Sequence, residues 1–222
     1  MPTLILNFKN YKEALGSKTL DLARAAEKAA KETGVNVIVV PPTPSLALVA
    51  SEVEIPLFCQ AVSDSYPGQS TGAVPPEAAL AAGAVGTLLN HSESRLFSSK
   101  LPKTMLRSQL AGLDVCLCSS NPSLIRRYAD VHPQFFAIEP PELIGMDRSV
   151  SKTRPDLVRK AIAASESSNF QGEVLCGAGI RDGNDVKTAL NLGAGGVIVS
   201  SAVVKSVQRQ AKLIEIAGAM RD

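Results

Sequence analysis

Residues 3–40 read TLILNFKNYKEALGSKTLDLARAAEKAAKETGVNVIVV. Two short apolar runs, Thr3–Phe8 and Val35–Val40, stand at the ends of this stretch. Between them Lys18–Glu32 is amphipathic, with its leucines and most of its alanines on one side and its charged residues mostly on the other. Apolar runs without alternation are typical of parallel strands buried on both faces. The stretch therefore predicts a strand, a helix and a second strand.

The same alternation of apolar runs and helical stretches continues along the chain. The further runs are Leu57–Val62, Gly86–Asn90, Asp114–Ser119, Phe135–Ile138, Glu173–Gly177 and Gly196–Val199. Helices are also predicted over Pro155–Ser165, Asp185–Leu192 and Val204–Ala217, with Asp182 and Asn184 as candidate N-cap residues.

Eight predicted strands, each followed by helical or turn material, favour a (β/α)8 TIM barrel of the α/β class. No linker divides the chain, so residues 1–222 are predicted to form a single barrel domain. Such barrels typically have about 250 residues, and we therefore expect a compact version with several shortened helices. An open doubly wound sheet, which needs fewer strands, is the less favoured alternative.

The composition excludes several classes of protein. Hydrophobic residues make up 45% and charged residues 20% of the 222 positions, which is typical of a globular protein and excludes disordered and fibrous chains. A net charge of +2 is too weak to hold nucleic acid or an anionic membrane by itself. No apolar run approaches the ~20 residues of a membrane span, and no secretory signal is evident.

The four cysteines, Cys59, Cys116, Cys118 and Cys176, lie inside apolar stretches and form no CxxC pair. This placement favours reduced, buried thiols over metal ligands or disulfides. We therefore expect a cytoplasmic protein without a metal site.

In a barrel of this kind the reacting groups lie where the strands end and in the loops that follow. A cation, an imidazole and a carboxylate occupy such positions: Lys9, His91 and Glu139. Asn7 and Lys9 are two residues apart, so both are expected to face the barrel mouth. Each residue alone has an ordinary structural explanation. Three complementary groups at one predicted rim favour acid–base catalysis.

Small residues follow the seventh and eighth runs, at Gly177–Ile180 and Ser200–Ser201. The first of these loops misses the dinucleotide-binding pattern, because Asp182 stands where the third glycine belongs. We therefore expect no NAD. Loops after strands seven and eight are the usual phosphate site of such barrels, since small residues let backbone N–H groups approach the anion. Tight turns that need a flexible backbone remain an equally good explanation of these residues.

The motifs taken together resemble a known family. Asn7-Phe8-Lys9, His91-Ser92-Glu93-Ser94-Arg95, and Glu139-Pro140 opening a loop that ends Ile144-Gly145 are similar to the motifs of triosephosphate isomerases. Their order and spacing match along essentially the whole chain. The short length, the 86–93 and 140–145 stretches, and Cys176-Gly177-Ala178-Gly179-Ile180 resemble the archaeal branch of this family.

The resemblance implies interconversion of dihydroxyacetone phosphate and glyceraldehyde 3-phosphate, a step of glycolysis and gluconeogenesis, without a cofactor. Glu139 would be the general base, neutral His91 the electrophile and Lys9 the electrostatic stabiliser, roles that are established for this family. Ser92 and Glu93 would contact these reacting groups without touching the substrate, with Lys9 as the expected partner of Glu93. The phosphosugar would be bound by Asn7, Lys9, Gly145, Gly179, Ser200 and Ser201.

The resemblance also implies a lid over Pro140–Met146 and a homo-oligomer, a dimer or a tetramer, with the Tyr66–Val74 loop at the interface. The chain departs from the family at two places. Met146-Asp147 replaces the usual Thr-Gly, and the eighth-strand loop has Ser200-Ser201-Ala202 where family members have glycines nearby. These departures bear on lid closure and on the fit of the phosphate, and neither of them removes a reacting group.

Two other functions stay open at this point. Another phosphosugar isomerase or epimerase on the same barrel would carry a different acid–base pair. A catalytically silent phosphate-binding barrel would need the small-residue loops but no base, and the presence of Lys9, His91 and Glu139 argues against it.

Overall fold

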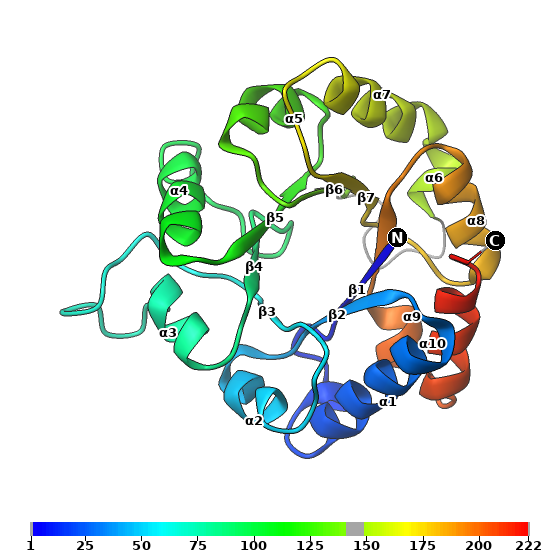
Figure 1. Ribbon diagram of the computed structural model, residues 1–222, viewed down its shortest axis with the longest axis horizontal. Helices are drawn as coiled ribbons and strands as arrows, with labels where there is room; N and C mark the ends of the chain where they lie inside the picture. Colours follow the sequence, from blue (N-terminus) through cyan, green and yellow to red (C-terminus); the bar gives the residue numbers. More distant parts are fainter. Residues whose placement is uncertain (1, 141–148, 222) are drawn as a thin grey trace.

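The computed structural model describes residues 2–140 and 149–221. The strands in this part of the chain are β1 (Thr3–Asn7), β2 (Asn36–Val40), β3 (Phe58–Cys59), β4 (Gly86–Leu89), β5 (Asp114–Ser119), β6 (Phe135–Ile138), β7 (Glu173–Cys176) and β8 (Gly196–Val199). They form one eight-stranded sheet in the order β2-β1-β8-β7-β6-β5-β4-β3, and every pair is parallel. A parallel bridge between Val39 and Leu57 joins the two ends, so the sheet curls into a nearly closed barrel (Figure 1). The predicted barrel is confirmed.

Helices surround the strand ring on the outside (Figure 1). They are α1 (Lys18–Thr33), α2 (Leu46–Ala50), α3 (Pro76–Ala81), α4 (Leu101–Ala111), α5 (Ser123–Tyr128), α6 (Val150–Thr153), α7 (Pro155–Glu166), α8 (Gly183–Asn191), α9 (Ser201–Val204) and α10 (Arg209–Gly218). Short 3-10 turns lie at Lys12–Ala14, Thr43–Ser45 and Ala129–Val131. Several helices have only one or two turns, as the short chain predicts. Among the described residues, no helix combines the length and apolar character that crossing a membrane requires.

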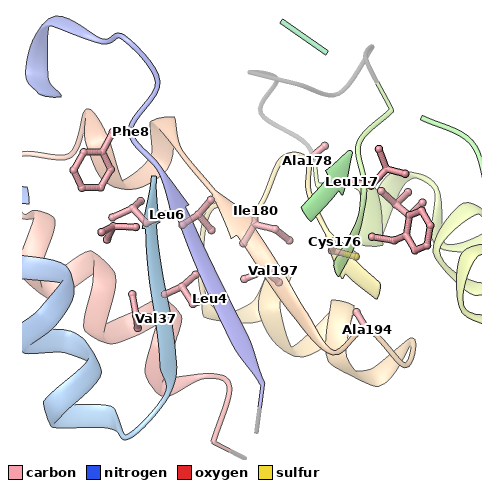
Figure 2. Close-up of a cluster of buried hydrophobic side chains, with 14 of the residues drawn as sticks. Leu4, Leu6, Phe8, Val37, Leu117, Cys176, Ala178, Ile180, Ala194 and Val197 are labelled. Carbon is pink, nitrogen blue, oxygen red and sulfur yellow. The ribbon is translucent and has the colours of Figure 1, made fainter. Parts of the chain in front are cut away.

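Side chains alternate between the two faces of the curved sheet. One buried cluster consists of strand residues alone and therefore fills the barrel interior: Ile5, Ile38, Val40, Phe58, Leu88, Cys116, Cys118, Phe135, Ala137, Leu175 and Ile198. The residues between them point outward and pack under the helices. Figure 2 shows part of this outer cluster around Leu4, Leu6, Val37 and Val197. The cysteines are free and buried, as predicted.

One predicted helix is wrong. Val204–Ala217 was expected to be continuous, but α9 ends at Val204 and α10 begins at Arg209. Between them the Ser206 hydroxyl accepts a hydrogen bond from the Gln208 backbone N–H at 3.1 Å, and Val207 is fully exposed. A serine that bonds the backbone two residues on offers an alternative to the helical pattern. An apolar residue that points to solvent has no place in a packed helical stripe.

Two predicted boundaries also need correction. The run Leu57–Val62 forms only the two-residue β3 and the bridge at Leu57, because the Cys59 thiol donates to the Ala61 carbonyl at 3.2 Å where the chain leaves the sheet. Helix α8 begins at Gly183 rather than at Asp185. Asp182 is its N-cap, accepting from the Asp185 N–H at 2.8 Å, whereas Asn184 lies within the helix.

Candidate active site

Every second residue of a strand points into the barrel, and at the ends of β1 and β6 this pattern places polar residues at the barrel mouth. Asn7 stands two residues after inward-facing Ile5, and Glu139 stands two residues after Ala137. A cavity of about 340 Å³ opens there, and Lys9, His91 and Glu139 all line it. The predicted binding residues Asn7, Gly179, Ser200 and Ser201 line the same cavity. This cavity therefore brings together all the predicted site residues except Ser92, Glu93 and Gly145, which are treated separately below.

Lys9 has a left-handed backbone conformation, with φ of 49°. Such a conformation costs an L-residue about 1–2 kcal/mol, and it persists only where surrounding contacts hold it. Here the Asn7 side chain accepts the Lys9 backbone N–H at 3.0 Å, and Gln60 donates to the Lys9 carbonyl at 3.0 Å. The turn directs Lys9 into the cavity, where only 11% of its side chain is exposed.

Lys9 and Glu93 form an ion pair, with 2.6 Å between Lys9 Nζ and Glu93 Oε1. This confirms the expected partner of Glu93. The Glu93 side chain is 56% exposed, so the pair lies at the edge of the cavity with its carboxylate toward solvent. The ammonium is thereby held beside His91 and Glu139, and its charge lowers the pKa of both.

His91 follows a second left-handed residue, Asn90, with φ of 59°. The Asn90 amide donates to the Cys118 carbonyl at 3.0 Å, and its oxygen accepts the Leu96 N–H at 3.2 Å. These bonds tie the turn after β4 to β5. The turn ends the inward-outward alternation of β4 and brings the His91 ring to the mouth.

The hydrogen bonds of His91 define its chemical form. Nδ1 accepts the backbone N–H of Glu93 at 3.1 Å, so the neutral ring carries its proton on Nε2. Burial and the nearby Lys9 charge lower the pKa of His91 to about 4, against a smaller opposite effect of Glu93. At neutral pH the ring is therefore an uncharged donor. Nε2 lies 3.7 Å from Glu139 Oε2, which leaves space for a reacting oxygen near both.

Glu139 is 3% exposed at the end of β6, and its backbone N–H donates to the Ser119 carbonyl at 2.8 Å. Burial raises its pKa to about 8, although the Cys118 thiol and the Lys9 ammonium lower it in part. Within the described residues Glu139 Oε2 has no hydrogen-bond partner. A buried carboxylate with a raised pKa and a free oxygen is suited to accept a proton from a substrate.

The absence of a side chain at Gly177 leaves room for the side chain of Glu139. A Cβ atom at Gly177 would lie 2.4 Å from Glu139 Cγ, a distance that requires one of them to move. The glycine after β7 therefore serves the carboxylate on the neighbouring strand as well as the loop that follows. From the sequence, Gly177 was assigned only to a phosphate loop, because the side-by-side position of β6 and β7 is not visible in one sequence.

The other end of the cavity suits an anion. Gly179 has a φ of 72°, a conformation in which its backbone can approach a ligand without strain. Among the described residues the buried Ser200 hydroxyl has no hydrogen-bond partner. Arg181 and Lys205 also line the cavity, although neither was predicted from the sequence. Lys205 lies over the Tyr11 ring with its Nζ 4.3 Å from the ring centroid. Arg181 directly follows the first small-residue loop and Lys205 lies one turn beyond the second, and these positions were the signal for both.

Ser92 does not line the main cavity. It lines a smaller one of about 230 Å³ next to it, together with Glu139, and its buried hydroxyl has no hydrogen-bond partner among the described residues. Ser92 is thus a neighbour of the carboxylate rather than of the reacting space. Gly145, most of the predicted Pro140–Met146 lid, and Met146-Asp147 lie outside the described residues.

Fold and site together define a class of protein: a (β/α)8-barrel enzyme that performs acid–base chemistry on a small anionic molecule. The sequence model of the family described as triosephosphate isomerase matches residues 2–218. The chain therefore belongs to the triosephosphate isomerase family.

Archaeal relatives are similar over nearly the full length of both chains. A triosephosphate isomerase of Pyrobaculum calidifontis is 43% identical over 217 residues, which cover 98% of this chain and 95% of the relative. One of Caldivirga maquilingensis is 41% identical over 98% of this chain and 96% of its own. One of Methanobacterium bryantii is 39% identical, with coverage of 97% and 95%. The resemblance to short archaeal members is confirmed.

Proposed function

We propose that the protein interconverts dihydroxyacetone phosphate and glyceraldehyde 3-phosphate through an enediolate, with Glu139, His91 and Lys9 as its catalytic residues. Family membership supports the reaction. The observation that carries the residue roles is that a neutral imidazole N–H and a buried carboxylate oxygen stand 3.7 Å apart in a cavity that a lysine also lines.

Glu139 moves a proton between the two adjacent carbons of the substrate. Its ionised form is the base, and burial makes that form a stronger base than an exposed glutamate. Oε2, which has no hydrogen-bond partner in the described structure, is the oxygen available for the transfer.

His91 and Lys9 stabilise the negative charge that develops on the substrate oxygens. The Nε2 proton of His91 points toward the space that Glu139 shares, and its Nδ1 is held by the Glu93 N–H. The Lys9 ammonium adds a positive charge, with Asn7 fixing the turn that presents it. Donors and charges that are already oriented contribute most in a site from which water is excluded.

The phosphate binds at the end of the cavity lined by Gly179, Ser200 and Ser201. The support is the positive φ of Gly179, the unpartnered Ser200 hydroxyl, and the cations Arg181 and Lys205 on the same rim. Gly145 and the Pro140–Met146 lid remain part of the proposal on the basis of the family motif alone.

A coupled assay with each triose phosphate tests the reaction, and Glu139→Gln tests the base. We expect Glu139→Gln to lower turnover roughly 10²–10⁴-fold while the fold survives. Glu166→Gln, the same change at an exposed residue that ends α7, is the matched control and keeps wild-type turnover. An unchanged rate in Glu139→Gln would remove this residue from the mechanism. Substrate binding without turnover by the wild-type protein would favour the silent barrel.

The protein also assembles as a homo-oligomer through the Tyr66–Val74 loop. Tyr66 is 69% exposed, yet it stacks on the buried Arg107 guanidinium at 4.1 Å, and Arg107 forms an ion pair with Glu77. A further cavity of about 360 Å³ is lined by Lys9 and Glu93 and also by Val74, the last residue of this loop. These features support the proposal that this exposed loop contacts another subunit.

Sedimentation tests the assembly. We expect the wild type to sediment as a dimer or tetramer. Arg107→Met removes the cation–π contact with the Tyr66 ring, so this variant should already dissociate at protein concentrations at which the wild type stays assembled. Lys160→Met, on the exposed side of α7, serves as the control with unchanged assembly. A wild-type chain that stays monomeric at every concentration would refute the proposed interface.

The cytoplasm is the proposed place of action. A triose phosphate interconversion belongs to glycolysis and gluconeogenesis, and the free, buried thiols suit a reducing compartment.

A further inference from the structure

A buried carboxylate outside the reacting groups ties together two segments at the barrel mouth. Asp185 lies in the first turn of α8 and is 4% exposed. Its Oδ1 accepts the Ser149 hydroxyl at 2.9 Å and is 2.7 Å from Lys152 Nζ, and its Oδ2 accepts the Arg181 backbone N–H at 2.9 Å. The Ser151 hydroxyl also donates to the Asp185 carbonyl, at 3.3 Å.

These bonds favour the ionised carboxylate. Burial raises the pKa of Asp185, but the bonds from Lys152, the Arg181 N–H and Ser149 together lower it further, so the net shift is downward. A buried ionised group with several hydrogen bonds stays in one position, because moving it would leave a charge without partners. Asp185 is thus a rigid point between α6 and α8.

The Arg181 N–H is the far end of the loop that lines the cavity. At the near end the Gly177 N–H donates to the Ile138 carbonyl at 2.9 Å, in continuation of the sheet. Between these two bonds lie Ala178, Gly179 and Ile180, all of which line the cavity. Gly179 has no Cβ and adopts a positive φ here, so its own side chain does not hold this short stretch in one conformation. Its conformation therefore depends on the bonds at its two ends.

We propose that Asp185 is a positioning residue for phosphate binding: its carboxylate holds the 177–181 loop against the 149–152 segment, so that the loop keeps the geometry that a phosphate group requires. The proposal rests on the phosphate site of the proposed function. Asp185 itself touches no substrate and acts through the Arg181 N–H.

Asp185→Asn tests this role, because it keeps the shape of the side chain and removes the charge and one acceptor. We expect the inhibition constants for inorganic phosphate and for glycerol 3-phosphate to rise on the order of tenfold, the usual size for a lost hydrogen bond to a charged group. Isomerisation of glyceraldehyde, which has no phosphate, should keep its wild-type rate. A purely structural residue would lower thermal stability without separating these two readouts.

Asp156→Asn is the matched control. Asp156 also stands in the first turn of a helix, α7, and lies 3.6 Å from Arg154 and 3.8 Å from Lys160. It should leave both inhibition constants unchanged. Amide hydrogen exchange gives a direct reading of the loop, because the Arg181 N–H should exchange faster in Asp185→Asn and not in Asp156→Asn.

Ser149→Ala is a second variant that removes one bond without leaving a buried charge unpaired. We expect a smaller rise in the same inhibition constants. Unchanged constants in Asp185→Asn overturn the proposal, and unchanged constants in Ser149→Ala do so if Asp185→Asn does not fold. Equal losses with glyceraldehyde and with the phosphate ligands also overturn it. A wild-type protein that does not isomerise triose phosphates would instead refute the proposed function.

Discussion

Glu139 shows how the surroundings of one residue set its chemistry. Buried between β5 and β7 at the end of β6, the carboxyl has a pKa of about 8, whereas its ordinary value is 4.5. Lys9 lowers this pKa and Glu93 raises it. The Lys9–Glu93 pair therefore tunes the base as well as supplying a positive charge to the cavity.

The pH dependence of activity should reveal this tuning. We expect kcat/KM to rise with pH through a midpoint near 8, as Glu139 loses its proton. Glu93→Gln should lower the midpoint, because Glu93 raises the pKa of Glu139, and Lys9→Met should raise it. The pKa of His91, about 4, lies too low to produce this limb. A midpoint near 4.5, or one that neither substitution moves, would assign the limb to another group.

The strands account for much of the site. The strand positions are readable in the sequence, and because residues two apart share a face of a strand, Asn7 lies on the inner side with Ile5, and Glu139 with Ala137. The positions of the strands, and hence of the residues that follow them, could therefore be predicted. The break between α9 and α10 could not, because a local Ser206–Gln208 hydrogen bond outweighed the apolar pattern.

Contacts between neighbouring elements were beyond the sequence. The left-handed turns at Lys9 and Asn90 depend on Gln60 and Cys118, which come from β3 and β5 regions far along the chain. Asp185 likewise became visible as a link only when α6 and α8 were placed side by side. One sequence shows which residue types are present, but tertiary contacts decide which of them meet.

The contact between β6 and the loop after β7 leads to a prediction at this scale. Gly177→Ala should lower kcat roughly 100-fold or more, because the added Cβ displaces Glu139 from the cavity and small displacements of reacting groups are costly. Gly218→Ala is the control, since a Cβ there has no atom within 4 Å, and its activity should not change. Turnover of both variants is measured with glyceraldehyde 3-phosphate. Wild-type kcat in Gly177→Ala would show that Glu139 does not depend on this space.

For the molecule as a whole, the buried base should carry a cost in stability. A carboxyl whose pKa is about 8 in the folded state and near 4.5 when unfolded holds an extra proton in the folded state between these values. The free energy of unfolding therefore falls as pH rises from about 4.5 to about 8, and the full destabilisation is present above that range.

Glu139→Gln should accordingly raise the melting temperature relative to wild type above pH 8. The difference should shrink as pH falls toward 4.5 and vanish below that value, where the wild-type carboxyl is protonated in both states. Thermal unfolding of both proteins between pH 4.5 and 9 measures this, with Glu166→Gln as the reference for an exposed site. A difference that does not vary with pH would contradict the raised pKa.

The narrow join between β2 and β3 has a consequence for the whole ring. There the sheet is closed through the Val39–Leu57 bridge and the hydrogen bond from the Val39 N–H to the Pro56 carbonyl, next to a strand of only two residues. Neighbouring strands joined by so few hydrogen bonds are expected to separate first when the folded protein opens locally. The Tyr66–Val74 segment follows β3 closely along the chain. A second subunit bound to that segment would therefore stabilise the part of the sheet that has the fewest hydrogen bonds.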